Sequence, residues 1–468
     1  MTFHRFVLIT LVFFFLSQTC SNQNNNGDEK EIKVNLKAGK ISERTTCRSN
    51  PDFTYHFYLP VSFNATQKYP LIIIFDAHAR SIMALSRFIE ASNKYGYIIV
   101  ASDQARNGIQ DVNPIINAIW DDVVNKLPID ISRIYTAGFS GGARIAASIA
   151  IYKGGIKGVI GCGGGMPLPG QELKNKFDFI SVVGTDDLNY QELKTLDKAL
   201  FDNGFNSQML TFDGGHEWPD SLIIADAVEW LEIMAMKQKR IPINDMLVRN
   251  YTTKYADLIN KRIMFDKSYE AFLFYNIILR DLDGLYDIKG YISSYNELLK
   301  DPRIEKGRIL EEKIKKEEID TQEKLLNFFK GGSFGLIKNE AIKLQKLVKD
   351  EKNEQFHKSK RLLGFLGMLS FLYTESSLNS QNKEKYLGFM EIYELLEPKN
   401  PDILFFKACQ SVMDKSSDKA MENLQKAINL GFYDFYRLQT VGYFEELRMK
   451  PEFDILLALT KENFEKLK

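Results

Sequence analysis

Between about residues 30 and 240 the chain alternates short apolar runs with amphipathic stretches. Residues 53–59 alternate as a half-buried strand does, whereas 71–75 and 97–101 are continuously apolar, as strands covered on both faces are. Further strands are predicted at 133–137, 158–161, 179–183 and 208–212, and helices at 82–94, 111–126, 142–153, 189–203 and 221–236. This alternation predicts an α/β fold with a mostly parallel sheet and helices on both faces.

After about residue 240 the pattern changes to long, charged amphipathic helices. Ala420-x3-Leu424-x2-Ala427, one 34-residue period after Tyr386, Met390 and Tyr393, precedes Gly431 and resembles the second helix of a tetratricopeptide repeat. Such units need neighbours to bury their apolar faces, so we predict a helical domain at 241–380 and tetratricopeptide-like repeats at 381–468. This region is expected either to bind a protein partner or gate substrate, or to be a cap that only packs on the first domain.

The amino-terminal residues have the pattern of an export signal. A short basic start is followed by the eleven-residue apolar run Phe6–Leu16, which is too short to cross a bilayer of about 30 Å as a helix. Cys20 stands where bacterial lipoprotein signals place the lipidated cysteine, although Ser17 replaces the usual aliphatic residue. We predict a signal peptide over 1–19, a flexible tether over 20–30 and a protein exported and lipid-anchored to the bacterial cell envelope; a secreted or periplasmic protein is the alternative.

Composition narrows the functional classes. The 468 residues carry 61 Lys+Arg against 61 Asp+Glu, a balance that argues against a nucleic-acid-binding protein. With 44% hydrophobic and 12% aromatic residues the chain is folded, and its length predicts more than one domain. Four cysteines without a CxxC pair are too few for a disulfide framework or a zinc site, and no metal or cofactor is expected.

The sequence around Ser140 predicts a nucleophile. Gly138-Phe139-Ser140-Gly141-Gly142 follows a predicted strand and precedes a predicted helix. Glycines two positions before and after a serine let strand and helix approach closely around a strained turn that exposes the hydroxyl. A second segment of this form, Gly331-Gly332-Ser333-Phe334-Gly335, follows a charged helical pattern and is predicted to be only a turn.

A serine nucleophile needs a general base, and the chain has five histidines. Four of them precede the serine or lie in the helical region: His4, His56, His78 and His357. His216 lies between glycines and a tryptophan after a predicted strand, where the backbone is free to place an imidazole. We predict His216 as the base; a plain core histidine is the alternative.

The remaining groups are an acid and an oxyanion hole. Asp186 and Asp187 end the strand predicted at 179–183, and either would hold the imidazole, a turn-forming aspartate being the alternative. Gly141 supplies one backbone donor by its position after the serine. The second is expected from Ala77 or His78 in the loop Asp76-Ala77-His78-Ala79-Arg80, unless that loop is an ordinary turn.

With these residues in place, the stretch from about 46 to 237 resembles the α/β-hydrolase superfamily. The segments GFSGGAR, GTDDLNY and GGHEWP are similar to those of polyhydroxybutyrate depolymerases, feruloyl esterases and dienelactone hydrolases. The order Ser140, Asp187, His216 is the order of this superfamily. The resemblance implies a hydrolase domain over 31–240 and favours Asp187 as the acid, because the family commonly has G-T-x-D. The loop after Phe75 departs from the family's usual His-Gly motif.

The leading hypothesis is a serine hydrolase that cleaves a carboxylic ester, small or polymer-borne, through a Ser-His-Asp triad and an acyl-enzyme. A serine peptidase like prolyl oligopeptidase shares this fold and triad order. A third hypothesis is a non-catalytic surface scaffold that binds a protein partner through the helical repeats. A membrane is expected as a partner only through the lipid anchor.

Overall fold

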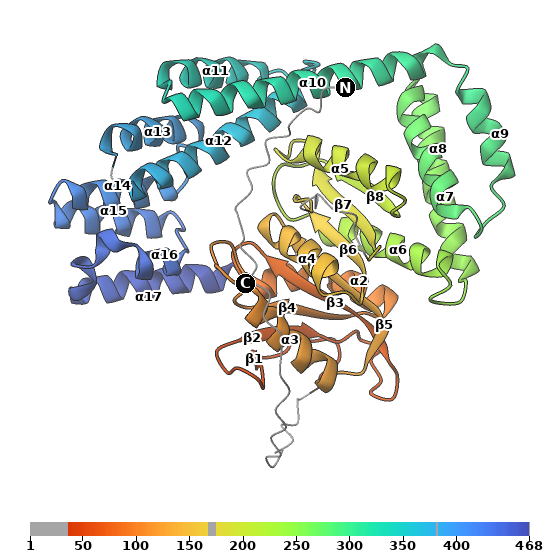
Figure 1. Ribbon diagram of the computed structural model, residues 1–468, viewed down its shortest axis with the longest axis horizontal. Helices are drawn as coiled ribbons and strands as arrows, with labels where there is room; N and C mark the ends of the chain where they lie inside the picture. Colours follow the sequence, from red (N-terminus) through yellow and green to blue (C-terminus); the bar gives the residue numbers. More distant parts are fainter. Residues whose placement is uncertain (1–35, 167–174, 381, 468) are drawn as a thin grey trace.

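The computed structural model describes residues 36–166, 175–380 and 382–467. The predicted signal peptide, the tether and Cys20 lie outside the described residues. Within the described ranges, no helix combines the length and the apolar character that crossing a membrane requires. Figure 1 shows a sheet domain beside a long array of helices.

A single eight-stranded sheet forms the centre of the first half of the chain (Figure 1). Its strands, in spatial order, are β1 (Thr45–Thr46), β2 (Thr54–Tyr58), β4 (Ile98–Ser102), β3 (Tyr69–Asp76), β5 (Ile129–Phe139), β6 (Ile156–Cys162), β7 (Asp178–Gly184) and β8 (Ser207–Phe212). β2 is antiparallel to β1 and β4, and all other neighbours are parallel. The seven predicted strands are present, and the two-residue β1 was not predicted.

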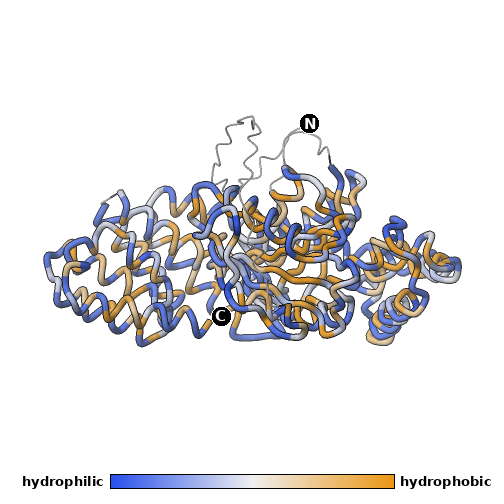
Figure 2. The backbone as a smooth tube through the Cα atoms, turned by 90° about the horizontal axis from the view of Figure 1, so that it is seen from below, coloured by the Kyte–Doolittle hydropathy of each residue, from blue (hydrophilic) through white to orange (hydrophobic). Residues whose placement is uncertain are grey.

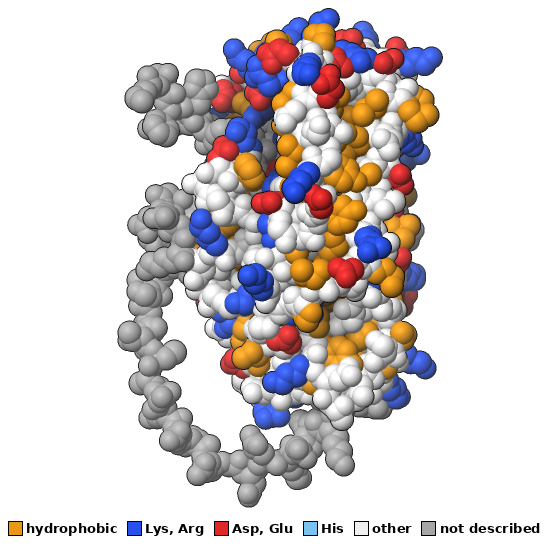
Figure 3. All heavy atoms as spheres, turned by 90° about the vertical axis from the view of Figure 1, so that its right-hand side faces the viewer, with side chains coloured by type: hydrophobic (Ala, Val, Ile, Leu, Met, Phe, Trp, Pro, Cys, Tyr) orange, Lys and Arg blue, Asp and Glu red, His pale blue; other side chains and the backbone are white. Residues whose placement is uncertain are grey.

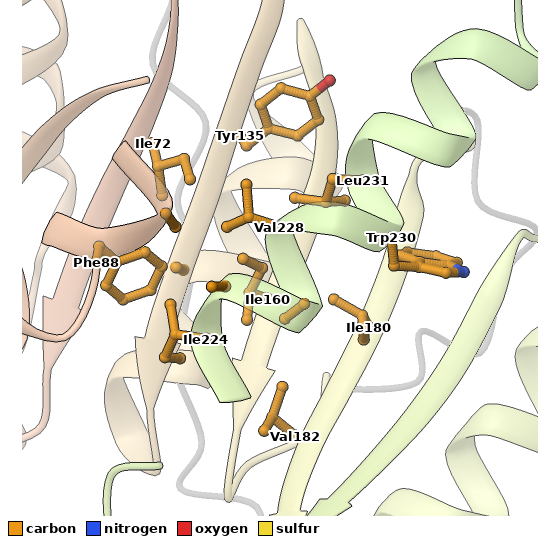
Figure 4. Close-up of a cluster of buried hydrophobic side chains, with 14 of the residues drawn as sticks. Ile72, Phe88, Tyr135, Ile160, Ile180, Val182, Ile224, Val228, Trp230 and Leu231 are labelled. Carbon is orange, nitrogen blue, oxygen red and sulfur yellow. The ribbon is translucent and has the colours of Figure 1, made fainter. Parts of the chain in front are cut away.

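Helices cover both faces of this sheet. One face packs against α3 (Asn113–Lys126), α4 (Gly141–Tyr152) and α5 (Tyr190–Asp202). The other packs against α1 (Ser81–Ser86), α2 (Ile89–Tyr95) and α6 (Ser221–Lys237), with Trp230 and Leu231 of α6 fully buried on the strands (Figure 4). The helix predicted at 82–94 is therefore two short helices. Because both faces are covered, the central strands are continuously apolar.

The core continues beyond residue 240. α7 (Asp245–Met264) and α8 (Ser268–Leu282) contribute Tyr251, Tyr255 and Ile278 to the same apolar cluster as α6. A buried Asp281 accepts hydrogen bonds from the Trp230 indole and the Tyr251 hydroxyl, at 3.1 and 2.7 Å. Figure 3 views this side, where apolar side chains lie between charged ones. α7 and α8 thus belong to the packing of the sheet domain.

The rest of the chain is helical, as predicted. It comprises α9 (Lys289–Leu298), α10 (Pro302–Gly331), α11 (Phe334–Leu347), α12 (Phe356–Asn379), α13 (Lys383–Leu396), α14 (Asp402–Met413), α15 (Ser417–Asn429), α16 (Phe435–Thr440) and α17 (Pro451–Lys466), with short 3₁₀ turns at Gly442–Phe444 and Leu447–Met449. α12 packs against α13 and α14 against α15. Apolar positions recur along these helices (Figure 2) and form two buried clusters. The predicted α/β fold followed by a helical region is confirmed, and the tetratricopeptide likeness stays a prediction.

Candidate active site

Ser140 occupies a strained turn between β5 and α4. Its φ of 54° and ψ of −116° are unusual for a residue with a side chain. A Cβ atom on Gly138 would lie 2.2 Å from the carbonyl oxygen of Gly142, and one on Gly142 would lie 2.0 Å from that of Phe75. Strand and helix therefore approach each other here as only glycines allow, which is what the sequence around Ser140 predicts.

The structure brings the three predicted triad residues together. His216 Nε2 lies 3.0 Å from Ser140 Oγ, and His216 Nδ1 lies 3.0 Å from each carboxylate oxygen of Asp187. Asp187 is completely buried, whereas the His216 side chain keeps 28% of its surface exposed. The imidazole thus has one nitrogen on the hydroxyl and the other on a buried carboxylate.

Further contacts hold Asp187 in this orientation. The backbone N–H of Asn189 donates to Asp187 Oδ1 at 2.8 Å, and the side-chain amide of Asn189 donates to the carbonyl of Gly163, also at 2.8 Å. Gly163 has φ of +55°, and a Cβ there would lie 3.0 Å from Asp187 Oδ2 and 2.8 Å from the Phe139 ring. The acid is therefore packed against a position that a larger residue would not fit.

Asp186 points away from the imidazole and toward the helical region. Its Oδ1 lies 2.7 Å from His357 Nδ1 and its Oδ2 lies 2.8 Å from Lys360 Nζ, both on α12. Sequence reasoning assigned His357 only to the helical region, and nothing in the sequence relates it to Asp186. Of the two aspartates that the sequence left as alternatives, the structure places Asp187 at His216.

The loop after β3 is organised by Asp76, which sequence reasoning passed over. Asp76 Oδ1 accepts from the amide N–H of His78 at 2.9 Å and Oδ2 accepts from the Trp218 indole at 2.8 Å. Arg80 forms a bidentate pair with the same carboxylate, at 2.9 Å on each oxygen. Burial alone would raise the pKa of Asp76, but the hydrogen bonds from Arg80 and Trp218 hold it below its usual value. Because Trp218 is two residues from His216, Asp76 connects this loop to the loop of the predicted base.

The amide of His78 is thus engaged by Asp76, while the carbonyl of Ala77 accepts the backbone N–H of Asn107 at 2.9 Å. The Asn107 side chain lies against the residue after the serine, since a Cβ on Gly141 would be 1.8 Å from its Oδ1 and 3.0 Å from its Nδ2. Asn107 therefore lies between Ala77 and Gly141. It is exposed and sits in a loop without a recognisable motif, so no sequence signal marks it.

A hollow of about 430 Å³ opens beside His216. Its walls come from three segments: the turn after β7, the loop after β8 and the first turns of α12. The lining residues are Asp186, Leu188, Asp213, Gly214, Gly215, His216, Lys360 and Gly364. The helical region thus forms one wall of the space next to the imidazole.

The second serine segment is a helix–helix turn. Ser333 lies between α10 and α11, directly after Gly332, which has φ of +64°. None of the hydrogen bonds described for the chain joins Ser333 to a histidine. The predicted turn is thus present, between two helices.

No protein-family model and no curated protein matches this chain. Among solved structures, an esterase from Pyrobaculum calidifontis is 15% identical, over 44% of this chain and 88% of its own, with a TM-score of 0.34. An S-formylglutathione hydrolase from Staphylococcus aureus is 13% identical, over 42% and 98%, with a TM-score of 0.35. Dipeptidyl peptidase 4 of Porphyromonas gingivalis is 16% identical, over 41% and 35%, with a TM-score of 0.32. Each of these similarities covers less than half of this chain. The function of this protein therefore depends on the geometry of its own site.

Proposed function

We propose that the protein is a serine hydrolase that cleaves carboxylic esters through an acyl-enzyme. The observation that carries this proposal is the contact chain from Ser140 through His216 to the buried Asp187, at 3.0 Å per step. A serine on a strained strand–helix turn with a base within hydrogen-bond reach is an activated nucleophile.

In the proposed first step Ser140 Oγ attacks the ester carbonyl carbon while His216 Nε2 takes the hydroxyl proton. Asp187 keeps the other nitrogen of the ring protonated and stabilises the imidazolium. The tetrahedral intermediate collapses as His216 gives its proton to the leaving alcohol oxygen, which leaves an acyl-serine. Water then attacks the acyl carbon while His216 takes one of its protons. The second tetrahedral intermediate collapses as His216 gives this proton to Ser140 Oγ, which releases the acid and restores the free serine.

The developing oxyanion is proposed to lie between the amides of Gly141 and Ala77. Ala77 is favoured over His78 because the His78 amide already donates to Asp76. The side-chain amide of Asn107 lies against Gly141 and is proposed as a third donor. Donors held in place before the reaction stabilise the transition state more than they stabilise the substrate.

A fluorophosphonate probe tests the nucleophile, since it should label the wild type and spare Ser140→Ala. Ser333→Ala is the matched control and should label as the wild type does. Labelling of Ser140→Ala but not of Ser333→Ala contradicts the assignment. A panel of p-nitrophenyl acyl esters, feruloyl esters and aminoacyl amides separates esterase from peptidase, and cleavage of amides alone rejects the ester proposal.

Export and lipid attachment at Cys20 remain part of the proposal. They rest on the sequence pattern over residues 1–20. Globomycin should block processing, and Cys20→Ala should release the protein from the membrane fraction. Unchanged fractionation of Cys20→Ala rejects the lipid anchor.

A further inference from the structure

α12 of the helical region holds the turn that carries the predicted triad acid. Asp186, next to Asp187, has its two carboxylate oxygens on His357 and Lys360, at 2.7 and 2.8 Å. One residue earlier, the carbonyl of Thr185 accepts from Arg361 Nη1 at 2.8 Å. The Asp186 side chain is 9% exposed, whereas the side chains of Lys360 and His357 are 42% and 57% exposed, so the carboxylate is shielded from water and its partners lie at the surface.

The same turn also supports the loop that carries the base. The amide N–H of Thr185 donates to Phe212 O at 2.9 Å, and that of Asp186 donates to Gly214 O at 2.9 Å. A Cβ on Gly184 would lie 2.3 Å from that same Gly214 oxygen, so the two loops are in close contact. A displacement of the turn would therefore move both sides of the pair formed by Asp187 and His216.

α12 is itself fixed to the rest of the molecule by a buried polar network. Arg361 forms a bidentate pair with Glu318 of α10, at 2.8 and 2.7 Å, and Glu318 is completely buried. Glu318 also accepts from Gln191 of α5 at 3.0 Å. The buried carboxylate of Glu318 thus joins α10 and α12 to α5, a helix that covers the sheet. Such a buried hydrogen-bonded network restricts the movement of α12 relative to the sheet domain.

We infer that the helical region completes the active site, with Lys360 of α12 as a positioning residue that acts through Asp186 on the pair formed by Asp187 and His216. Two aspartates in succession then have two tasks, the first anchoring the turn and the second holding the imidazole. The inference rests on the proposed hydrolase function. It assigns to the helical region a part in catalysis, in place of a separate binding surface or a passive cap.

The test measures how fast a fluorophosphonate probe labels Ser140 in the full-length protein, with the maximal rate constant and the half-saturating concentration determined separately. The leaving group of this probe is fluoride, which is small. Labelling therefore does not require a large leaving group to enter the hollow that Lys360 lines. Lys360→Met should lower the maximal rate constant about 10- to 100-fold, because small displacements of a base cost that much. The half-saturating concentration should change little.

Lys358→Met is the matched control. Lys358 lies two residues away on the same helix, and its ion pair at 2.8 Å is with Glu317 inside the helical region. A merely structural loosening of α12 would lower labelling in both variants, whereas positioning through Asp186 lowers it only in Lys360→Met. Equal losses in the two variants overturn the inference.

Asp186→Asn and the double variant complete the test. Asp186→Asn should slow labelling about as much as Lys360→Met, and the double variant should be no slower than either one. If the loss in the double variant is the product of the two single losses, Lys360 does not act through Asp186 and the inference is overturned. If Lys360→Met is labelled as fast as the wild type, the inference is overturned while the proposed function stands. A wild-type protein that is not labelled at Ser140 overturns the proposed function together with the inference.

Discussion

At the scale of single residues, neighbouring side chains of one type have different surroundings. Asp187 is completely buried against the imidazole, while Asp186 faces Lys360 and His357 of α12. The sequence presents both as strand-end aspartates, and it favours Asp187 only through the G-T-x-D resemblance. The direction in which each points depends on the fold of the turn, which has contacts with Asn189, the residue before α5, and with Arg361 of α12.

Exchanging each aspartate for asparagine should separate these roles. Asp187→Asn should lower kcat for a p-nitrophenyl ester about 10⁴-fold, because the amide no longer favours the reactive tautomer of His216. Asp186→Asn should lower kcat only about 10- to 100-fold, as expected for a group that positions the turn. Steady-state kinetics on both variants checks this, and a larger loss in Asp186→Asn would reverse the assignment.

Asn107 gives a second prediction at this scale. Asn107→Ala should lower kcat about 10²- to 10³-fold, with a smaller change in KM, because an oxyanion donor acts mainly in the transition state. Gln110→Ala is the control, since Gln110 is an exposed amide in the same loop. A change confined to KM would mean that Asn107 binds substrate and does not stabilise the oxyanion.

At the scale of elements, the central strands were predictable because they are covered on both faces and so are continuously apolar. β3 and β4, predicted at 71–75 and 97–101, extend over Tyr69–Asp76 and Ile98–Ser102. The two residues of β1 are too few for any periodicity. Ser140 and His216 were predictable because glycines mark their turns. Asp76 and Asn107 were not, since the hydrogen bonds of Asp76 with Trp218 and of Asn107 with Ala77 join segments distant in sequence.

One such contact between elements has a consequence for stability. Asp103, after β4, accepts from Thr54 Oγ1 at 2.6 Å, lies 2.9 Å from His56 Nδ1 and also accepts from Ser81 of α1. Burial raises its pKa, but the contacts with His56, Ser81 and Thr54 outweigh burial and lower the pKa to about 2. Asp103 thus joins β2, α1 and the end of β4.

The stability that Asp103 contributes depends on pH because its pKa is lower in the folded protein. Unfolded Asp103 has the ordinary pKa of 3.8, above the folded value, so its contribution is present above about pH 4 and is lost as the pH falls through about 2. Asp103→Asn should lower the free energy of unfolding by about 2 kcal/mol at pH 7, and the difference from wild type should shrink below pH 4. Urea unfolding at pH 7, 5, 4 and 3 measures it. The exposed Asp52→Asn is the control, and a difference that stays constant down to pH 3 contradicts the prediction.

At the scale of the whole molecule, the helical region contacts the sheet domain on two sides of the predicted site. On one side α12 holds the turn of Asp186. On the other, Tyr433 packs edge-on against His78 at 5.8 Å, and Tyr436 lies under the guanidinium of Arg106 at 3.9 Å. The change in pattern near residue 240 predicted a separate helical region, but the sequence has no signal for contacts between residues some 170 or more positions apart.

The buried pair of Arg361 and Glu318 makes this arrangement testable by stability. Arg361→Met should lower the stability by about 3–5 kcal/mol, because it leaves the carboxylate of Glu318 buried without its partner. Replacing both residues, as Arg361→Met with Glu318→Leu, should recover most of that loss, since apolar side chains of similar volume have no charge to desolvate. Shifts of the urea midpoint measure both, with Lys300→Met as control because its pair with Glu297 is exposed. If the double variant is as unstable as Arg361→Met, the cost lies in lost packing and in the lost hydrogen bonds of Arg361 with Thr185 and of Glu318 with Gln191, and the buried charge is not its source.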